Sequence, residues 1–311
     1  MDTNEIRIRV IGSINMDLVM QMERVPEEGE TVLGDRYFFA PGGKGGNAAI
    51  AAARLGGKIS FAGCVGNDIY GHELKQSLEK ENVDTSLLLE SDEVSTGFAP
   101  IFVQSSGQNR IIAFPGANRS VTAEDTEKLL SGDIDALMMQ LEMDPELVIS
   151  ASNLAVSRSI PVILDAGPAQ AFPLERMPGI TILSPNETET YALTGILPDT
   201  IERMKEAAIC LQHRSHCRIV VLKLGDRGAY IYSDTVRKQV PAFPIKAVDP
   251  TAAGDAFTGA MALKFLSTGN IEEAVLFGNA AGALTATRLG AQPSLPREEE
   301  VLSFLASHAG K

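Results

Sequence analysis

Short apolar runs alternate with helical segments along most of the chain, and this alternation limits the fold more than any other feature. The runs predicted as strands are 6–11, 58–65, 136–141, 161–164, 180–183 and 219–224. Apolar residues recur at helical spacing over 48–55, 70–81, 123–130, 145–158 and 271–287. This rhythm predicts an α/β fold with a doubly wound, mostly parallel sheet flanked by helices.

Two stretches interrupt the alternation, because they contain β-like pieces and no helix of useful length. Residues 15–43 hold the pieces DLVMQM, ETVLG and RYFFA, and residues 95–113 hold a hairpin signal at Ser105-Ser106-Gly107. We expect these two stretches to form a small separate sheet that is a lid over a site or an interface with another subunit. Residues 1–14, 44–94 and 114–311 would form the α/β core.

Composition and charge narrow the class of protein. A net charge of −13 disfavours binding to a nucleic acid, whose phosphate backbone it would repel. The sequence has neither a run of 18 apolar residues nor a basic, then apolar N-terminus, so we expect no membrane span and no signal peptide. The three cysteines lack CxxC spacing, which fits the reducing cytoplasm.

The segment 248–257 (VDPTAAGDAF) predicts an anion site. A polar turn ends in Gly254 and Asp255 and runs directly into a helix, whose first amide groups have no internal acceptor. The N–H groups of residues 252–255 are therefore suited to hold a phosphate, and Asp255 to accept a proton from an attacking hydroxyl. Alternatively, Asp255 only caps the helix.

A glycine-rich loop, Pro41-Gly-Gly-Lys-Gly-Gly-Asn47, precedes an alanine-rich helix that Gly56 would end. Gly45 follows the lysine where a Walker A loop has Ser or Thr, so a Walker A loop is excluded. The loop does match the dinucleotide pattern GxGxxA, but Pro41 breaks the preceding strand and the motif does not open the first βαβ unit. We favour a loop whose backbone, Lys44 and Asn47 surround a small polar ligand.

Polar residues also follow several predicted strands, at the sheet edge where open α/β folds bind ligands. Asn15 and Asp17 lie two residues apart and could hydrogen-bond sugar hydroxyls, or they are only a turn-forming and a solvated residue. Glu142 follows 136–141, where it either faces a ligand or marks the exit into solvent. The segment 184–189 (SPNETE) offers oxygen ligands to a hydrated Mg²⁺, or Asn186 simply caps a helix. The turn 225–228 suits close approach of a nucleotide, or it is a plain hairpin.

Five motifs occur in a fixed order: 12–17 (GSINMD), 42–47 (GGKGGN), 141–142 (LE), 184–189 (SPNETE) and 249–255 (DPTAAGD). Together they resemble the ribokinase family of carbohydrate kinases over about residues 6–305. The resemblance implies ATP-dependent phosphorylation of the 5-hydroxyl of D-ribose, with ATP, Mg²⁺ and an activating K⁺, and a homodimer formed through the β lid.

The resemblance also implies roles for individual residues. The general base would be Asp255 and the anion hole the amides of Ala252, Ala253 and Gly254. The sugar contacts would be Asn15, Asp17, Gly42, Gly43, Lys44, Asn47, Glu142 and Asp255. The ATP contacts would be Asn186, Lys223, Gly225, Asp226, Gly228, Gly254 and Asn279. Glu189 would hold Mg²⁺ through water, and K⁺ would be held at Asp249, Thr251, Thr285, Arg288, Gly290 and Ser294.

The sequence departs from the family pattern at a few positions. Pro250 replaces a threonine, and Asp165-Ala166-Gly167 stands where the family usually has Asn-Pro before an Ala-Pro-Ala run. The first change bears on K⁺ affinity, and sugar preference stays open. Alternative substrates are 2-deoxyribose, another sugar or a nucleoside. In other classes, the alternatives are a sugar-binding regulator without catalysis and a dinucleotide-dependent dehydrogenase.

Overall fold

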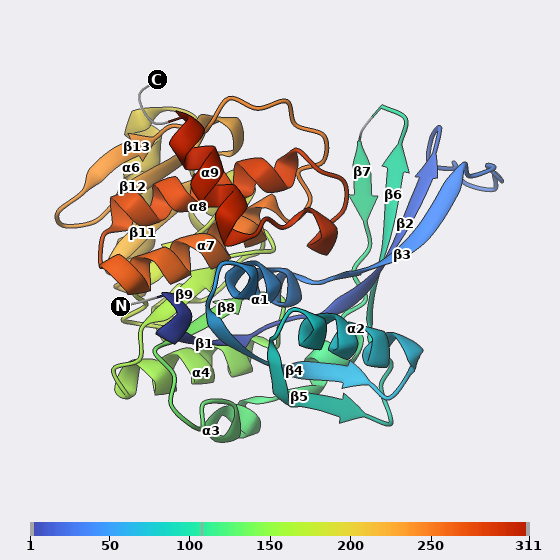
Figure 1. Cartoon of the computed structure of the whole chain (residues 1–311), viewed down its shortest axis with the longest axis horizontal. Coiled ribbons are helices and arrows are strands. Elements are labelled where there is room, and N and C mark those ends of the chain that lie inside the picture. Colours follow the sequence, from blue (N-terminus) through green and yellow to red (C-terminus); the bar gives the residue numbers. More distant parts are fainter. Residues whose placement is uncertain (1–2, 107, 309–311) are drawn as a thin grey trace.

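The computed structural model describes residues 3–106 and 108–308, and its main element is a nine-stranded sheet of order β13-β12-β11-β10-β9-β8-β1-β4-β5 (Figure 1). The strands are β1 (Arg7–Ile11), β4 (Lys58–Gly66), β5 (Asp84–Ser91), β8 (Ala136–Gln140), β9 (Val162–Asp165), β10 (Ile182–Ser184), β11 (Ile219–Lys223), β12 (Ala229–Tyr232) and β13 (Arg237–Val240). All neighbours pair in parallel except β12, which runs antiparallel to both β11 and β13. The predicted mostly parallel sheet is confirmed.

Helices cover both faces of this sheet. They are α1 (Lys44–Arg54), α2 (Ile69–Lys80), α3 (Thr126–Leu129), α4 (Pro145–Ser157), α5 (Glu187–Thr194), α6 (Ile201–Ser215), α7 (Ala253–Thr268), α8 (Ile271–Ala286) and α9 (Glu298–His308). One apolar core joins the sheet to α1, α2, α7 and α8, and a second core joins it to α3, α4 and α6. The doubly wound arrangement is therefore confirmed as well. None of the helices among the described residues is long and apolar enough to cross a membrane.

A second, four-stranded sheet of order β3-β2-β6-β7 stands apart from the first (Figure 1). It consists of β2 (Asn15–Met22), β3 (Arg36–Gly42), β6 (Gly97–Gln104) and β7 (Asn109–Ile111). β2 pairs antiparallel with β3 and parallel with β6, and β6 pairs antiparallel with β7. The second sheet is thus built from the two β-rich stretches. Gly107 of the predicted hairpin signal lies outside the described residues.

Some local predictions are wrong. The piece 30–34 (ETVLG) is not a strand, and Leu33 is 89% exposed there, because no neighbouring strand pairs with it. The helix predicted over 123–130 is a 3₁₀ turn followed by the four residues of α3. β5, α6 and α9 were not predicted: β5 is an edge strand, and only Leu88 of its eight residues is buried. A half-exposed strand such as β5 carries a weak apolar pattern, whereas α6 has buried apolar residues at helical spacing (Met204, Ala207, Ala208 and Leu211), so its signal was present and overlooked.

The order of the strands places the site. The chain turns from β1 toward β4 and β5 on one side and later fills β8 to β13 on the other. Strand order therefore reverses between β1 and β8, and open α/β sheets bind ligands at the carboxyl ends of strands beside such a point. The residues that follow these two strands include Asn15, Asp17 and Glu142.

Candidate active site

The first turn of α7 offers backbone donors. Ala252 precedes the helix in the left-handed region (φ 60°), and no side chain caps the helix at that residue. The amide of Ala253 donates to the Pro250 carbonyl at 3.1 Å. In residues 3–106 and 108–308, no acceptor bonds the amides of Ala252 and Gly254. Two of the three amides predicted for the anion hole are therefore free for an anion, and the third is held by the turn.

Asp255 lies in the first turn of α7 and is 6% exposed. Its Oδ2 accepts a hydrogen bond from Asn47 Nδ2 at 2.8 Å, and its Oδ1 lies 4.0 Å from Lys44 Nζ. The alternative that Asp255 merely caps the helix is wrong, because Ala252 occupies the cap position. Burial raises the pKa of Asp255, although Lys44 and Asn47 oppose this effect.

Lys44 and Asn47 both come from α1, whose beginning meets the beginning of α7. Close packing between the two helices brings these ends together: a Cβ on Gly259 of α7 would lie 2.8 Å from the Ala48 carbonyl of α1. The charge of Asp255, followed by that of Glu142, raises the pKa of Lys44 despite burial. The ammonium group therefore stays charged beside the carboxylate.

The glycine loop is pressed against the start of β2. Gly43 has φ 87°, and a Cβ there would lie 2.7 Å from Ile14 Cα. At Gly42 a Cβ would lie 2.6 Å from Asp17 Cγ. Position 43 therefore requires glycine, whereas a side chain at position 42 would displace the Asp17 carboxylate.

Asn15 and Asp17 face the same region from β2. Asn15 Oδ1 accepts from Asn118 Nδ2 at 2.7 Å, which leaves the Asn15 amide hydrogens to face a ligand. Asn118 is 1% exposed and also bonds both the N–H and the carbonyl of Ile14, at 2.9 and 3.2 Å. Sequence reasoning missed Asn118. The turn at Pro115-Gly116 just before it was the available signal.

Three acidic side chains surround the same space. Asp17 is 8% exposed, and burial, with smaller effects of Glu142 and Asp255, raises its pKa to about 7. The Glu142 carboxylate accepts from the Ser13 hydroxyl and from the Lys44 amide, the latter at 3.4 Å. It does not simply mark an exit into solvent. A neutral, hydroxyl-rich ligand would satisfy such a cluster of acceptors.

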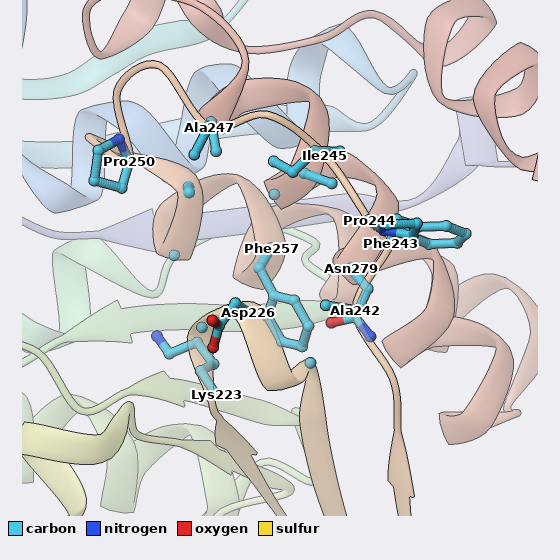
Figure 2. Close-up of a pocket in the computed structure, with 17 residues that line it drawn as sticks. Lys223, Asp226, Ala242, Phe243, Pro244, Ile245, Ala247, Pro250, Phe257 and Asn279 are labelled. Atoms are coloured by element: carbon cyan, nitrogen blue, oxygen red, sulfur yellow. The ribbon is translucent and has the colours of Figure 1, made fainter.

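A cavity of about 480 Å³ lies beside the first turn of α7, on the side away from Asn15 and Asp17 (Figure 2). Of the predicted ATP contacts, Lys223, Gly225, Asp226, Gly228, Gly254 and Asn279 line it, together with Ala242, Phe243, Pro244, Ile245, Ala247, Pro250, Ala253, Phe257, Gly282, Ala283 and Ala286. Figure 2 shows Lys223 at the opposite end of the cavity from Phe243 and Asn279. Sequence reasoning missed the segment 242–247, because this irregular stretch carries no motif.

Asn186 does not line this cavity. It caps α5 in a reciprocal arrangement with Glu189: Asn186 Oδ1 accepts from the Glu189 amide at 2.9 Å, and Glu189 Oε2 accepts from the Asn186 amide at 2.7 Å. The cautious prediction of a helix cap is confirmed. Burial raises the pKa of Glu189, which is 3% exposed.

The residues predicted to bind K⁺ gather around two loops that Asp249 joins. Its Oδ1 accepts from Thr251 Oγ1 at 2.6 Å and its Oδ2 from the Gly290 amide at 2.9 Å. Thr285 and Ser294 turn their hydroxyls to the Ala281 and Ala291 carbonyls, at 2.9 and 2.7 Å. The Arg288 side chain pairs with Glu300, so only its backbone is available to a cation.

Comparisons with known proteins identify the family and the fold. The model of the pfkB family carbohydrate kinases matches residues 6–298. The chain is 36% identical to a ribokinase of Haemophilus influenzae over 302 residues, which is 96% of this chain and 98% of that protein. It is 32% identical to a deoxyribokinase of Salmonella typhi, over 96% and 98% of the two chains. A solved structure of Arabidopsis thaliana ribokinase complexed with ribose and ATP superimposes with a TM-score of 0.86 at 32% identity, over 96% and 98%.

Proposed function

Since the chain belongs to the pfkB family of carbohydrate kinases, we propose that it transfers the terminal phosphoryl group of ATP to the 5-hydroxyl of D-ribose. One observation carries this proposal: the buried Asp255, held by Asn47 and Lys44, lies between a pocket of acceptors and the 480 Å³ cavity. A hydroxyl on one side and a triphosphate on the other would meet at its carboxylate. The product would be D-ribose 5-phosphate.

In this reaction Asp255 is the general base. The 5-hydroxyl gives its proton to the Asp255 carboxylate as its oxygen attacks phosphorus, and ADP leaves toward the cavity. The amides of Ala252 and Gly254, with Ala253 after a small shift of the turn, hold the transferring group as an anion hole. The raised pKa of Asp255 increases its basicity, and the ammonium of Lys44 offsets the added negative charge.

The sugar is held by side chains from both sheets and from the glycine loop. Asn15 donates from an amide that Asn118 orients, and Asp17 and Glu142 accept from hydroxyls. Gly42, Gly43, Lys44 and Asn47 close the pocket from the other side. Asp17 binds best in its ionised form, because only then are both of its oxygens acceptors.

The nucleotide contacts proposed are Lys223, Gly225, Asp226, Gly228, Gly254 and Asn279. Mg²⁺ would neutralise charge on the phosphates and would have few direct protein ligands. We propose that Mg²⁺ is bound mainly by phosphate oxygens and water, and that Glu189 reaches it through water. K⁺ is proposed to bind to oxygen atoms of the two loops that Asp249 joins. Pro250 lies in one of these loops, where it fixes φ and removes an N–H.

We also propose a homodimer formed through the second sheet. This sheet and the residues just after β7 expose large apolar side chains: Tyr37 is 69% exposed, Ile111 58%, Ile112 50% and Phe114 53%. Apolar groups gathered in this way favour contact with another protein surface. The free thiols of Cys64, Cys210 and Cys217 fit a cytoplasmic location.

The identity to deoxyribokinases favours 2-deoxyribose as a second candidate substrate. The test is ADP release with ATP and Mg²⁺ in the presence of D-ribose, 2-deoxyribose, fructose or adenosine, each with and without K⁺. Highest kcat/KM on ribose, increased by K⁺, supports the proposal. Highest kcat/KM on 2-deoxyribose moves the substrate but keeps the site. No turnover on any of the four would refute the proposal and favour a sugar-binding regulator.

A further inference from the structure

Asp165 and Lys223 form a buried ion pair beneath the site. Asp165 ends β9, Lys223 ends β11, and β10 lies between these strands. Lys223 Nζ donates to Asp165 Oδ2 at 2.6 Å, and the two side chains are 11% and 3% exposed. The mechanism above gives the Asp165 carboxylate no task.

The position of Asp165 is fixed from several directions. Its Oδ2 also accepts from Thr258 Oγ1 of α7 at 2.7 Å, and its Oδ1 accepts from the Gly167 amide at 3.3 Å. Burial alone would raise the pKa of Asp165, but the charges of Lys223 and Lys44 and these hydrogen bonds outweigh burial and lower it. Asp165 is therefore an ionised group that ties the sheet to α7.

Stability alone is a weak reason for such a pair. Removing two charges from water has a large free-energy cost, and replacing a buried pair with apolar residues is often neutral or stabilising. An ion pair buried beneath the site is better explained if one of its residues fixes the position and the charge of the other. The geometry around Lys223 indicates which member that is.

The ammonium of Lys223 lies beside the first turn of α7. Its Nζ is 3.7 Å from the place that a Cβ of Gly254 would take, and Lys223 also lines the large cavity. Lys44 approaches the same helix end from the side of Asp255. The helix beginning with its free amides is thus flanked by two ammonium groups, one toward the sugar pocket and one toward the cavity.

We propose that Lys223 binds the terminal phosphate end of ATP and that Asp165 is a positioning residue that holds this lysine charged and aimed at the first turn of α7. The inference rests on the proposed function, because it requires ATP in the cavity. Phe243 and Asn279 lie toward the other end of the cavity (Figure 2). With its phosphates at Lys223, ATP would place its base and ribose at that end, where Lys223 makes no contact. Lys223 therefore discriminates nucleotides by their number of phosphates.

The test compares ATP, ADP and AMP binding by titration calorimetry in the whole protein. The main variant is the double change Asp165→Asn with Lys223→Met, because it removes the pair together and leaves no bare buried charge. We expect ATP binding to weaken by about 10- to 100-fold, the loss of one charge-assisted hydrogen bond or more, and AMP binding to change by less than about twofold. ADP should fall between the two.

Two further variants separate binding from structure. Lys223→Arg keeps the positive charge and should retain the preference for ATP over AMP within about fivefold. Lys75→Met, which removes an exposed ion pair with Glu90, is the matched control and should bind all three nucleotides as the wild type does. If the pair had a purely structural role, the double variant would bind ATP, ADP and AMP more weakly by the same factor. Lys223→Arg would then not retain the preference for ATP over AMP.

The failures are distinguishable. A wild-type protein that binds no ATP overturns the proposed function and this inference with it. A wild-type protein that binds ATP, together with a double variant that keeps the preference for ATP over AMP, overturns this inference alone.

Discussion

Replacing Asp17 with asparagine should stabilise the ligand-free protein relative to the wild type, and by about 2.7 kcal/mol more at pH 8 than at pH 5. Asp17 is 8% exposed and lies near Glu142 and Asp255, so its pKa rises from an ordinary 3.8 to about 7. In the folded state the carboxyl group therefore keeps its proton up to about pH 7, whereas in the unfolded state it loses it near pH 4. Folded molecules bind more protons than unfolded ones between these values, so stability falls as pH rises through this window.

The size of the effect follows from the two pKa values. At about 1.36 kcal/mol for each tenfold change in acidity, ionising Asp17 reduces the free energy of unfolding by at most about 4 kcal/mol above pH 7. For a chain of 311 residues, that corresponds to about 6 °C in melting temperature. Asparagine has nearly the same shape and never ionises, so the variant escapes this loss.

The assay is urea unfolding of both proteins at pH 5, 6, 7 and 8, without sugar or nucleotide. The stability difference between variant and wild type should grow with pH and level off above about pH 7. Asp234→Asn, at an exposed position, controls for the loss of a negative charge in general. A difference that stays constant across the four pH values would refute the raised pKa. In a separate readout, ribose affinity of the wild type should rise through pH 7, whereas the variant should bind weakly at every pH.

Three further substitutions test the site. Asp255→Asn should lower kcat by about 10³- to 10⁴-fold and keep ribose binding in calorimetry, because it removes the base and not the pocket; turnover close to wild type would remove Asp255 from that role. Asn118→Ala should raise the KM for ribose about tenfold and change kcat less, since it frees the Asn15 amide to rotate. The control is Asn153→Ala, which removes an exposed hydrogen bond to the Arg176 carbonyl. An equal effect of the two variants on KM would contradict the reasoning. Gly42→Ala should raise the KM for ribose at least about tenfold, because its Cβ would displace the Asp17 carboxylate. Gly34→Ala is the control and should be neutral, because its Cβ would lie 3.5 Å from the Gln21 carbonyl. An unchanged KM in Gly42→Ala would show that ribose binding does not depend on the present position of the Asp17 carboxylate.

The sequence predicted those parts of the site that lie next to one another along the chain. Asp255 follows its own glycine turn, and Lys44 and Asn47 belong to one loop, so local pattern was enough to propose them as site residues. The parallel sheet was equally accessible, since buried strands are continuous apolar runs. Segments with half-exposed elements, such as β5, gave a pattern too weak to assign.

Pairs that form only in the folded chain escaped prediction. Asn118 lies 103 residues from the Asn15 side chain that it orients, and Asp165 lies 58 residues from Lys223. Each is an ordinary polar residue at the end of a turn or strand when the sequence is taken alone. Only the strand order, which sets β9 and β11 on either side of β10, reveals that two opposite charges meet.

Only three residues, 12–14, separate the end of β1 in the first sheet from the start of β2 in the second. Asn15 and Asp17 therefore belong mechanically to the second sheet, whereas Asn47 and Asp255 belong to helices packed on the first. If a sugar contacts all four residues, as proposed above, it would connect the two sheets, and its binding would oppose any change in the angle between them. A sugar that lacks one hydroxyl would connect them less firmly, so the mobility of the second sheet would then report how well the ligand fits.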